Sequence, residues 1–300
     1  MLLTQGSACS EGDRNGARKF KKFLESLHEG KLIWVLTAVF APLLTEYDPS
    51  KADITNSFLP PAFCEGGVRE HPLGTDEVGR DIYARLVYGA RISLIVAILA
   101  GMVSMAIGTV AGMLAGYFGG TVDNLLMRLV DVMNAFPFMF MALCFMVALG
   151  SGLGNIVLVL GITGWVPYAR TVRAEVLAIR GRDFVVAAEI SGCSSNRLIF
   201  THIFPNIIDS AIVIATMQMA NTILSEASLT FLGMGLPADI PSWGQMISSG
   251  RSYIYTNFWL TLIPGLAIFL VSLSINFVGD WVRDLRDPRL RGATKNSEAE

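Results

Sequence analysis

Apolar residues occur in this chain in long blocks, and short polar segments separate the blocks. Four stretches contain no charged residue, and they cover residues 92–122, 132–169, 210–225 and 252–279. A helix needs roughly 20 mainly apolar residues to cross the hydrocarbon core of a bilayer. Buried helices of a soluble protein rarely stay uncharged over such lengths, so the pattern predicts an all-α integral membrane protein.

The apolar blocks have room for six transmembrane helices. The expected helices are Leu32–Leu44, 92–118, 124–149, 154–178, 206–231 and 257–279, so residues 32–279 would form the membrane domain. The first block is short, and its helix must begin earlier than Leu32 to cross the bilayer. The second block contains GTVAGMLAG, and small residues of this kind let neighbouring helices approach closely.

Six transmembrane helices assign each connecting segment to one side of the membrane or the other, and the basic residues are divided unevenly between these two sides. Charged residues make up 16% of the chain, below the roughly 25% of an average soluble protein. One side receives Lys51, Arg69, Arg80, Arg85, Arg91 and Arg251, and the side with both termini receives the other 17 of the 23 Lys and Arg. Cytoplasmic loops are enriched in Lys and Arg. The pattern therefore places segments 1–31 and 280–300 in the cytoplasm, and loops 45–91 and 233–256 outside.

Residues 183–205, DFVVAAEISGCSSNRLIFTHIFP, interrupt the apolar blocks with an amphipathic segment between the fourth and fifth expected helices. Its residues predict a hairpin of two short helices. Asp183 is a favourable N-cap, Gly192 suits the positive φ after a helix end, and Pro205 would end the second helix. The apolar residues between them need a cover. The pattern alone leaves open whether that cover is a protein partner or the bilayer surface.

The same segment resembles the EAA loop of ABC-importer permeases. The resemblance rests on the two alanines 187 and 188, on Gly192 four residues later and on Pro205 thirteen residues after that. It implies a coupling helix on loop 180–205 that docks on a cytoplasmic ATPase. Val186 stands where the family usually has Glu, which removes a specific polar contact there. The expected coupling residues are Asp183, Phe184, Val186, Ala187, Ala188, Gly192, Ile203 and Pro205.

Four further motifs are similar to the dipeptide, oligopeptide and nickel permease family, C-type subunit. They are HPLGTDEVGRDIYARLVYGARISL, GYFGGTVDNLLMRLVDVMNAFP, SEASLTFLGMG and GDWVRDLRDPRLRG. The resemblance implies the type I importer fold, with six helices and a bacterial or archaeal plasma membrane location. It also implies a B-type permease, two ATPase subunits that use ATP and Mg, and an extracytoplasmic solute-binding protein as partners. No cofactor or nucleic acid is expected on this chain.

The sequence argues against an enzyme. A Walker A motif needs Lys followed by Ser or Thr, and none of the six lysines is so followed. The three histidines lie outside or at the edges of the expected helices, and GxSG is absent. A secondary transporter is a remote alternative, because neither an internal repeat nor an intramembrane acid relay is evident. The solute remains open between peptides, nickel or metal chelates, and sugars; the missing His or Cys cluster favours peptides over metals.

A few charged residues near the expected helices are candidates for structural or pathway roles. Arg128 and Asp131, three residues apart, predict a local ion pair. Glu226 would line the outer vestibule or bond the outer loop 233–256. The remaining candidates, which we expect to tie down the first outer loop, are Asp76, Arg80 and Asp81.

Overall fold

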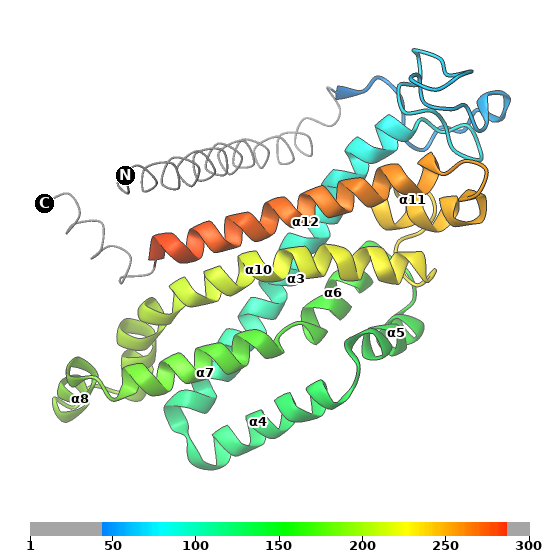
Figure 1. Cartoon of the computed structure of the whole chain (residues 1–300). Coiled ribbons are helices and arrows are strands. Elements are labelled where there is room, and N and C mark those ends of the chain that lie inside the picture. Colours follow the sequence, from blue (N-terminus) through cyan, green and yellow to red (C-terminus); the bar gives the residue numbers. More distant parts are fainter. Residues whose placement is uncertain (1–43, 287–300) are drawn as a thin grey trace, which may run out of the picture.

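The computed structural model describes residues 44–286, and Figure 1 shows the arrangement of their helices. The expected helix Leu32–Leu44, apart from its last residue, lies outside the described residues, as do segments 1–31 and 287–300. Within the described range the elements are helical, with an isolated bridge between Thr75 and Asp81. They are η1 (Ile54–Asn56), α3 (Ile82–Phe118), α4 (Gly120–Ala135), α5 (Phe138–Leu149), α6 (Leu153–Thr163), α7 (Val166–Arg180), α8 (Asp183–Ile190), α9 (Ser195–Arg197), η2 (Leu198–Ile203), α10 (Phe204–Phe231), α11 (Trp243–Gly250), η3 (Arg251–Tyr253) and α12 (Trp259–Arg286).

Helix α3 lies at the centre of the bundle and runs its full length (Figure 1). It packs against α7, α10 and α6, and α10 in turn packs against α12. Its 37 residues begin at Ile82, ten residues before the expected start. The extension follows from Asp81, whose carboxylate accepts the backbone N–H of Ala84 over 2.6 Å and so caps the helix.

The glycines of α3 let α7 approach its backbone, as the small-residue run predicted. A Cβ added to Gly108 would lie 2.5 Å from the carbonyl oxygen of Trp165. A Cβ on Gly112 would lie 2.6 Å from the carbonyl oxygen of Ala169. Real Cβ atoms do not approach backbone so closely, so a larger residue would push the two helices apart.

The third and fourth expected helices are each broken near the middle. Helices α4 and α5 meet at 91° across Phe136 and Pro137, because Phe136 precedes a proline and takes an extended conformation. Helices α6 and α7 are separated at Gly164 and Trp165, and Pro167 occupies the first turn of α7. These two breaks face each other across the cavity described below.

Three helical stretches in the described part of the chain are long and apolar enough to cross a membrane. They are Ile82–Phe118, Ser195–Phe231 and Trp259–Asp280, and the bent pair α4–α5 would make a fourth if it counts as one span. The α6–α7 region, expected as one span over 154–178, is split into two shorter helices. The all-helical membrane fold is thus confirmed, while the number of six spans stays a prediction.

The end of the bundle that carries residues 44–81 also carries α11 (Figure 1). Trp243 at the start of α11 is fully buried, and its indole N–H donates to the carbonyl oxygen of Leu86 on α3 over 3.0 Å. At the opposite end of the bundle, α8 and the turns around it project beyond α7 and α10 (Figure 1).

Candidate functional site

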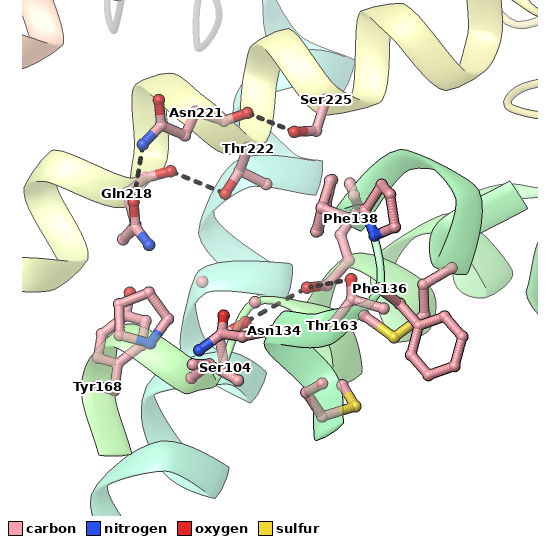
Figure 2. A pocket seen from close by; sticks show the side chains of 18 residues that line it. Ser104, Asn134, Phe136, Phe138, Thr163, Tyr168, Gln218, Asn221, Thr222 and Ser225 are labelled. Atoms are coloured by element: carbon pink, nitrogen blue, oxygen red, sulfur yellow. Dashed lines mark hydrogen bonds between the residues drawn. The ribbon is translucent and has the colours of Figure 1, made fainter. Parts of the chain in front are cut away.

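A cavity of about 450 Å³ opens in the middle of the bundle, between the two helix breaks and α10. This volume falls within the range of about 300–1,000 Å³ typical of small-molecule sites. We call it the central cavity (Figure 2). The residues that line it are Gly101, Ser104, Met133, Asn134, Phe136, Pro137, Phe138, Met141, Leu160, Thr163, Gly164, Val166, Pro167, Tyr168, Gln218, Asn221, Thr222 and Ser225.

One wall of the central cavity is a polar stripe on α10, made by Gln218, Asn221, Thr222 and Ser225 (Figure 2). These residues recur at helical spacing, so they share a face. The Asn221 amide donates to the side-chain oxygen of Gln218 over 2.8 Å. The hydroxyl of Thr222 donates to the backbone carbonyl oxygen of Gln218 over 2.8 Å. The hydroxyl of Ser225 donates to the backbone carbonyl oxygen of Asn221, also over 2.8 Å. The stripe is therefore held in place by α10 itself.

The opposite wall comes from the bend between α4 and α5 and is mostly apolar. Phe136 is 60% exposed and Phe138 is 37% exposed, and Met133 and Met141 flank them. Pro137 is the N-cap of α5, which starts at Phe138 in a new direction, and the bend places Phe136 and Phe138 in the lining of the cavity (Figure 2). A solute in the cavity would thus meet hydrogen-bonding groups on one side and apolar surface on the other.

The lining of the central cavity contains no Asp, Glu, Lys, Arg or His. Transferring an unpaired ion into such surroundings costs several kcal/mol or more. Among residues 44–286 no group of three or more His, Cys, Asp or Glu is placed to hold a metal ion. The cavity offers amides and hydroxyls, so it suits neutral polar groups rather than bare ions.

The segment 180–205 lies at the end of the bundle where α8 projects (Figure 1). Gly192 has φ of +81°, as expected for the residue that follows a helix end. Asp183 is the first residue of α8 rather than its N-cap, which is Arg182; its carboxylate still lies in the first turn, where the helix dipole favours it. Ser194 is the N-cap residue of α9, and its side chain makes no capping hydrogen bond.

The expectation that Pro205 ends the second short helix is wrong. The chain passes from α9 through the π-helical turn η2 into α10, and Ser195–Phe231 is one helical stretch. Pro205 falls in the first turn of α10, where its missing N–H costs little. Ile203, just before it, is fully buried in the cluster that joins α7, α8 and α10. The chain is therefore helical throughout the connection from α9 to α10, and no loop separates the two helices.

One face of α8 presents apolar side chains to the outside. Phe184 is 42% exposed, Val186 is 39% exposed and Ile190 is 82% exposed, whereas Val185 between them is buried at 1%. Ala187 is also exposed, and Ala188 packs partly against the inner cluster. The buried residue anchors α8, and the exposed ones form an apolar patch that a binding partner would cover. We call these exposed residues the α8 face.

Asp76, Arg80 and Asp81, which the sequence analysis named as candidates, hold residues 44–81 against the start of α3. The Arg80 guanidinium Nε lies 2.6 Å from Asp76 Oδ2, and Asp76 also accepts the backbone N–H of Arg80. Asp81 caps α3 and its other oxygen lies 2.8 Å from His71 Nδ1. In the same loop, hydrogen bonds led by the one from the Thr55 hydroxyl lower the pKa of the Asp53 carboxyl below its ordinary value.

Glu226 is fully buried between α3 and α10 and does not line the central cavity. The hydroxyl of Ser93 donates to one carboxylate oxygen over 3.1 Å, and the hydroxyl of Thr230 donates to the other over 3.0 Å. The Thr230 hydroxyl also accepts the backbone N–H of Leu236, in the loop that follows α10. Glu226 therefore connects α3 to α10 directly and reaches the loop through Thr230.

The expected local pair of Arg128 and Asp131 is not formed. Asp131 instead lies 3.0 Å from the guanidinium of Arg170, so this exposed ion pair joins α4 to α7. A stronger pair joins the same two helices, since Arg173 makes two hydrogen bonds to Asp123, the second over 2.6 Å. Sequence spacing favoured the partner on the same helix because it cannot show which charges a neighbouring helix brings close.

The residues of the central cavity were not predicted from the sequence. Two signals for it were present. One is Pro137, which interrupts an apolar block long enough for one helix. The other is the helical spacing of Gln218, Asn221 and Ser225. Neither signal reveals a cavity alone, because the cavity requires the α4–α5 bend to face α10 in three dimensions.

The apolar helices, the broken spans around one cavity and the projecting α8 define a multi-span membrane protein built for transport. Solved structures of ABC importers have the same fold. The methionine ABC transporter MetNI in inward facing conformations aligns with a TM-score of 0.55 at 18% identity, over 68% of this chain and 97% of that one. An amino acid ABC transporter crystallised with histidines aligns with a TM-score of 0.51 at 15% identity, over 66% of this chain and 92% of that one.

The family follows from sequence comparison. Residues 108–292 match the family described as binding-protein-dependent transport system inner membrane component, and this chain belongs to that family. It is 40% identical to a di/tripeptide transport system permease protein of Pseudomonas aeruginosa, over 87% of this chain and 86% of the relative. It is 37% identical to an oligopeptide transport system permease protein of Bacillus subtilis, over 86% and 82%. The resemblance to the C-type permease subunits of ABC importers is thereby confirmed.

Proposed function

We propose that this chain forms half of the translocation pathway of an ATP-driven importer of di- or oligopeptides. The observation that carries the proposal is the identity of about 40% with peptide permeases along most of both chains. The uncharged central cavity supports it, because a peptide backbone is neutral and rich in hydrogen-bonding groups. A B-type permease subunit would complete the pathway, and a solute-binding protein would deliver the peptide from outside.

The α8 face is the proposed docking surface for a cytoplasmic ATPase subunit that uses ATP and Mg. Phe184, Val186 and Ile190 are exposed apolar residues on a short helix that Val185 anchors to the bundle. Both termini would then lie in the cytoplasm, with residues 44–81 and α11 outside. This orientation agrees with the excess of Lys and Arg on the α8 side of the chain.

The test is uptake by a strain that lacks this gene, with and without a plasmid copy. Labelled di- and oligopeptides are offered beside labelled nickel, which the metal-chelate alternative would require. Loss of peptide uptake that the plasmid restores is the expected result. Loss and rescue of nickel uptake with intact peptide uptake would contradict the peptide proposal and favour the metal alternative.

The coupling assignment has its own variant and its own control. Phe184→Asp puts a charge on the α8 face and should abolish uptake and co-purification of the ATPase, while membrane insertion persists. Phe184→Leu keeps the α8 face apolar and should retain most of the uptake, since the Phe184 side chain is 42% exposed. Full uptake and full ATPase co-purification by Phe184→Asp would show that the ATPase docks elsewhere.

A further inference from the structure

Two amide side chains meet on the wall of the central cavity. Gln218 and Asn221 lie three residues apart on α10, and the Asn221 amide nitrogen donates to the Gln218 side-chain oxygen over 2.8 Å. Asn221 is exposed and Gln218 is partly exposed, so a solute in the cavity can reach both (Figure 2). The hydrogen bond between them fixes the orientation of both side chains before any solute arrives.

The bond uses one N–H of the Asn221 amide and one lone pair of the Gln218 oxygen, and it leaves the other polar atom of each side chain unbonded. The Gln218 amide nitrogen and the Asn221 side-chain oxygen have no hydrogen-bond partner among residues 44–286. Oxygen and nitrogen of such side chains are assigned from the surrounding hydrogen bonds. If the oxygen and nitrogen positions are exchanged in both side chains, Gln218 donates to Asn221 instead. One amide nitrogen and one amide oxygen of the pair still remain unbonded. The free oxygen of Asn221 and the free amide nitrogen of Gln218 lie at opposite ends of the hydrogen-bonded pair (Figure 2).

A peptide group carries a carbonyl oxygen and an N–H on opposite edges, and these are the complements of the free donor and the free acceptor. We infer that Gln218 and Asn221 form a subsite that binds a peptide group of the solute during its passage. The inference rests on the proposed function and names what the cavity recognises. Phe136 and Phe138 line the same cavity and offer no hydrogen-bonding group to a solute side chain, so the hydrogen bonds of the amide pair are directed at the backbone.

The absence of charge in the lining sharpens this recognition. A cation or anion in the cavity would lose its hydration without gaining an opposite charge. A peptide group is neutral, and a hydrogen bond to Gln218 or Asn221 replaces one that it made with water. The subsite thus favours neutral backbone over a bare metal ion, while the charged ends of a peptide must lie outside this part of the cavity.

The test compares a peptide with an analogue that lacks only the N–H. The purified complex, with its partner subunits and binding protein, is reconstituted in vesicles and supplied with ATP. Uptake of alanyl-alanine is measured beside uptake of its ester analogue, in which oxygen replaces the amide N–H. The ratio of the two uptake rates is expected to fall about three- to tenfold in Gln218→Leu/Asn221→Leu, the effect of one lost hydrogen bond.

Three further variants separate recognition from general damage. Gln245→Leu removes an amide of the same type on α11, outside the cavity, and should leave the ratio unchanged. The exchange of the pair, Gln218→Asn with Asn221→Gln, keeps both amides and should restore part of the ratio. If the double Leu variant does not assemble with its partners, the single change Asn221→Ala should lower the ratio in the same direction.

The outcomes distinguish this inference from the proposed function. A ratio that stays at the wild-type value in an assembled double Leu or Asn221→Ala variant overturns the subsite and leaves peptide import standing. A wild-type complex that moves no peptide overturns both.

Discussion

The close approach of α3 and α7 gives a prediction whose magnitude follows from the structure. In Gly112→Ala the new methyl would lie 2.6 Å from the Ala169 carbonyl oxygen and 2.8 Å from Val172 Cβ. Ordinary contact begins near 3.4 Å, so the two helices must separate by most of an ångström. Forcing an extra methyl group into a packed interface costs about 1–3 kcal/mol.

A matched control lies on the same helix. A Cβ added to Gly101 meets no other described atom within 4 Å, so Gly101→Ala introduces no clash. Both substitutions bring the same gain in helix propensity, up to about 1 kcal/mol. The difference between the two variants therefore isolates the cost of overpacking, which we expect to be about 1–3 kcal/mol.

The assay is unfolding of the purified chain in mixed detergent micelles, followed by circular dichroism. Gly112→Ala should unfold at a lower denaturant fraction than Gly101→Ala, and Gly101→Ala should match or exceed the wild type. Equal unfolding free energies for the two variants would refute the argument, because they would mean that α3 and α7 have room for a methyl group at Gly112.

Three further predictions use the same unfolding assay. Glu226→Ala should cost about 1–3 kcal/mol, because buried hydroxyls lose their acceptor, and Glu226→Gln should cost less; equal losses would contradict this. Asp81→Ala should cost about 1–2 kcal/mol through the lost cap of α3 and the lost contact to His71, whereas Asp81→Asn should retain most of the cap. Arg173→Lys should weaken the two-bond contact with Asp123. A double-mutant cycle of the two positions should give a coupling free energy below about 1 kcal/mol, because Arg173 is partly exposed. A coupling free energy of zero would show that the pair does not hold α4 to α7.

The sequence predicted those parts of the fold that depend on local composition. Uncharged blocks identify apolar helices because the bilayer demands them, and the glycines of α3 identify a close helix contact because of their size. Gly192 identifies a helix end because its backbone needs positive φ. Each of these features can be read from residues adjacent on the chain or at helical spacing.

The features that the sequence did not predict depend on neighbouring helices. Asp131 pairs with Arg170 on α7 rather than with Arg128, because the fold brings α7 beside α4. Pro205 alone suggests the end of a helix. In the structure it lies in the first turn of α10, which follows the π-helical turn η2 directly, and a proline is compatible with that position. The central cavity forms where the α4–α5 break and the α6–α7 break face α10. No local sequence pattern shows that these three segments lie together.

The helical continuity at Pro205 links the two candidate sites mechanically. Ser195–Phe231 is one stretch, and the 23 steps from Ser195 to Gln218 span about 35 Å at the usual rise of about 1.5 Å per residue. A hinge at Pro205 would absorb a displacement of α8, whereas a continuous helix transmits it. Ile203 is fully buried where α8, η2 and α10 meet, so a movement of α8 also shifts the start of α10. We therefore expect that an ATPase bound to the α8 face would move the amide pair of Gln218 and Asn221 relative to the α4–α5 bend, which opens or closes the central cavity.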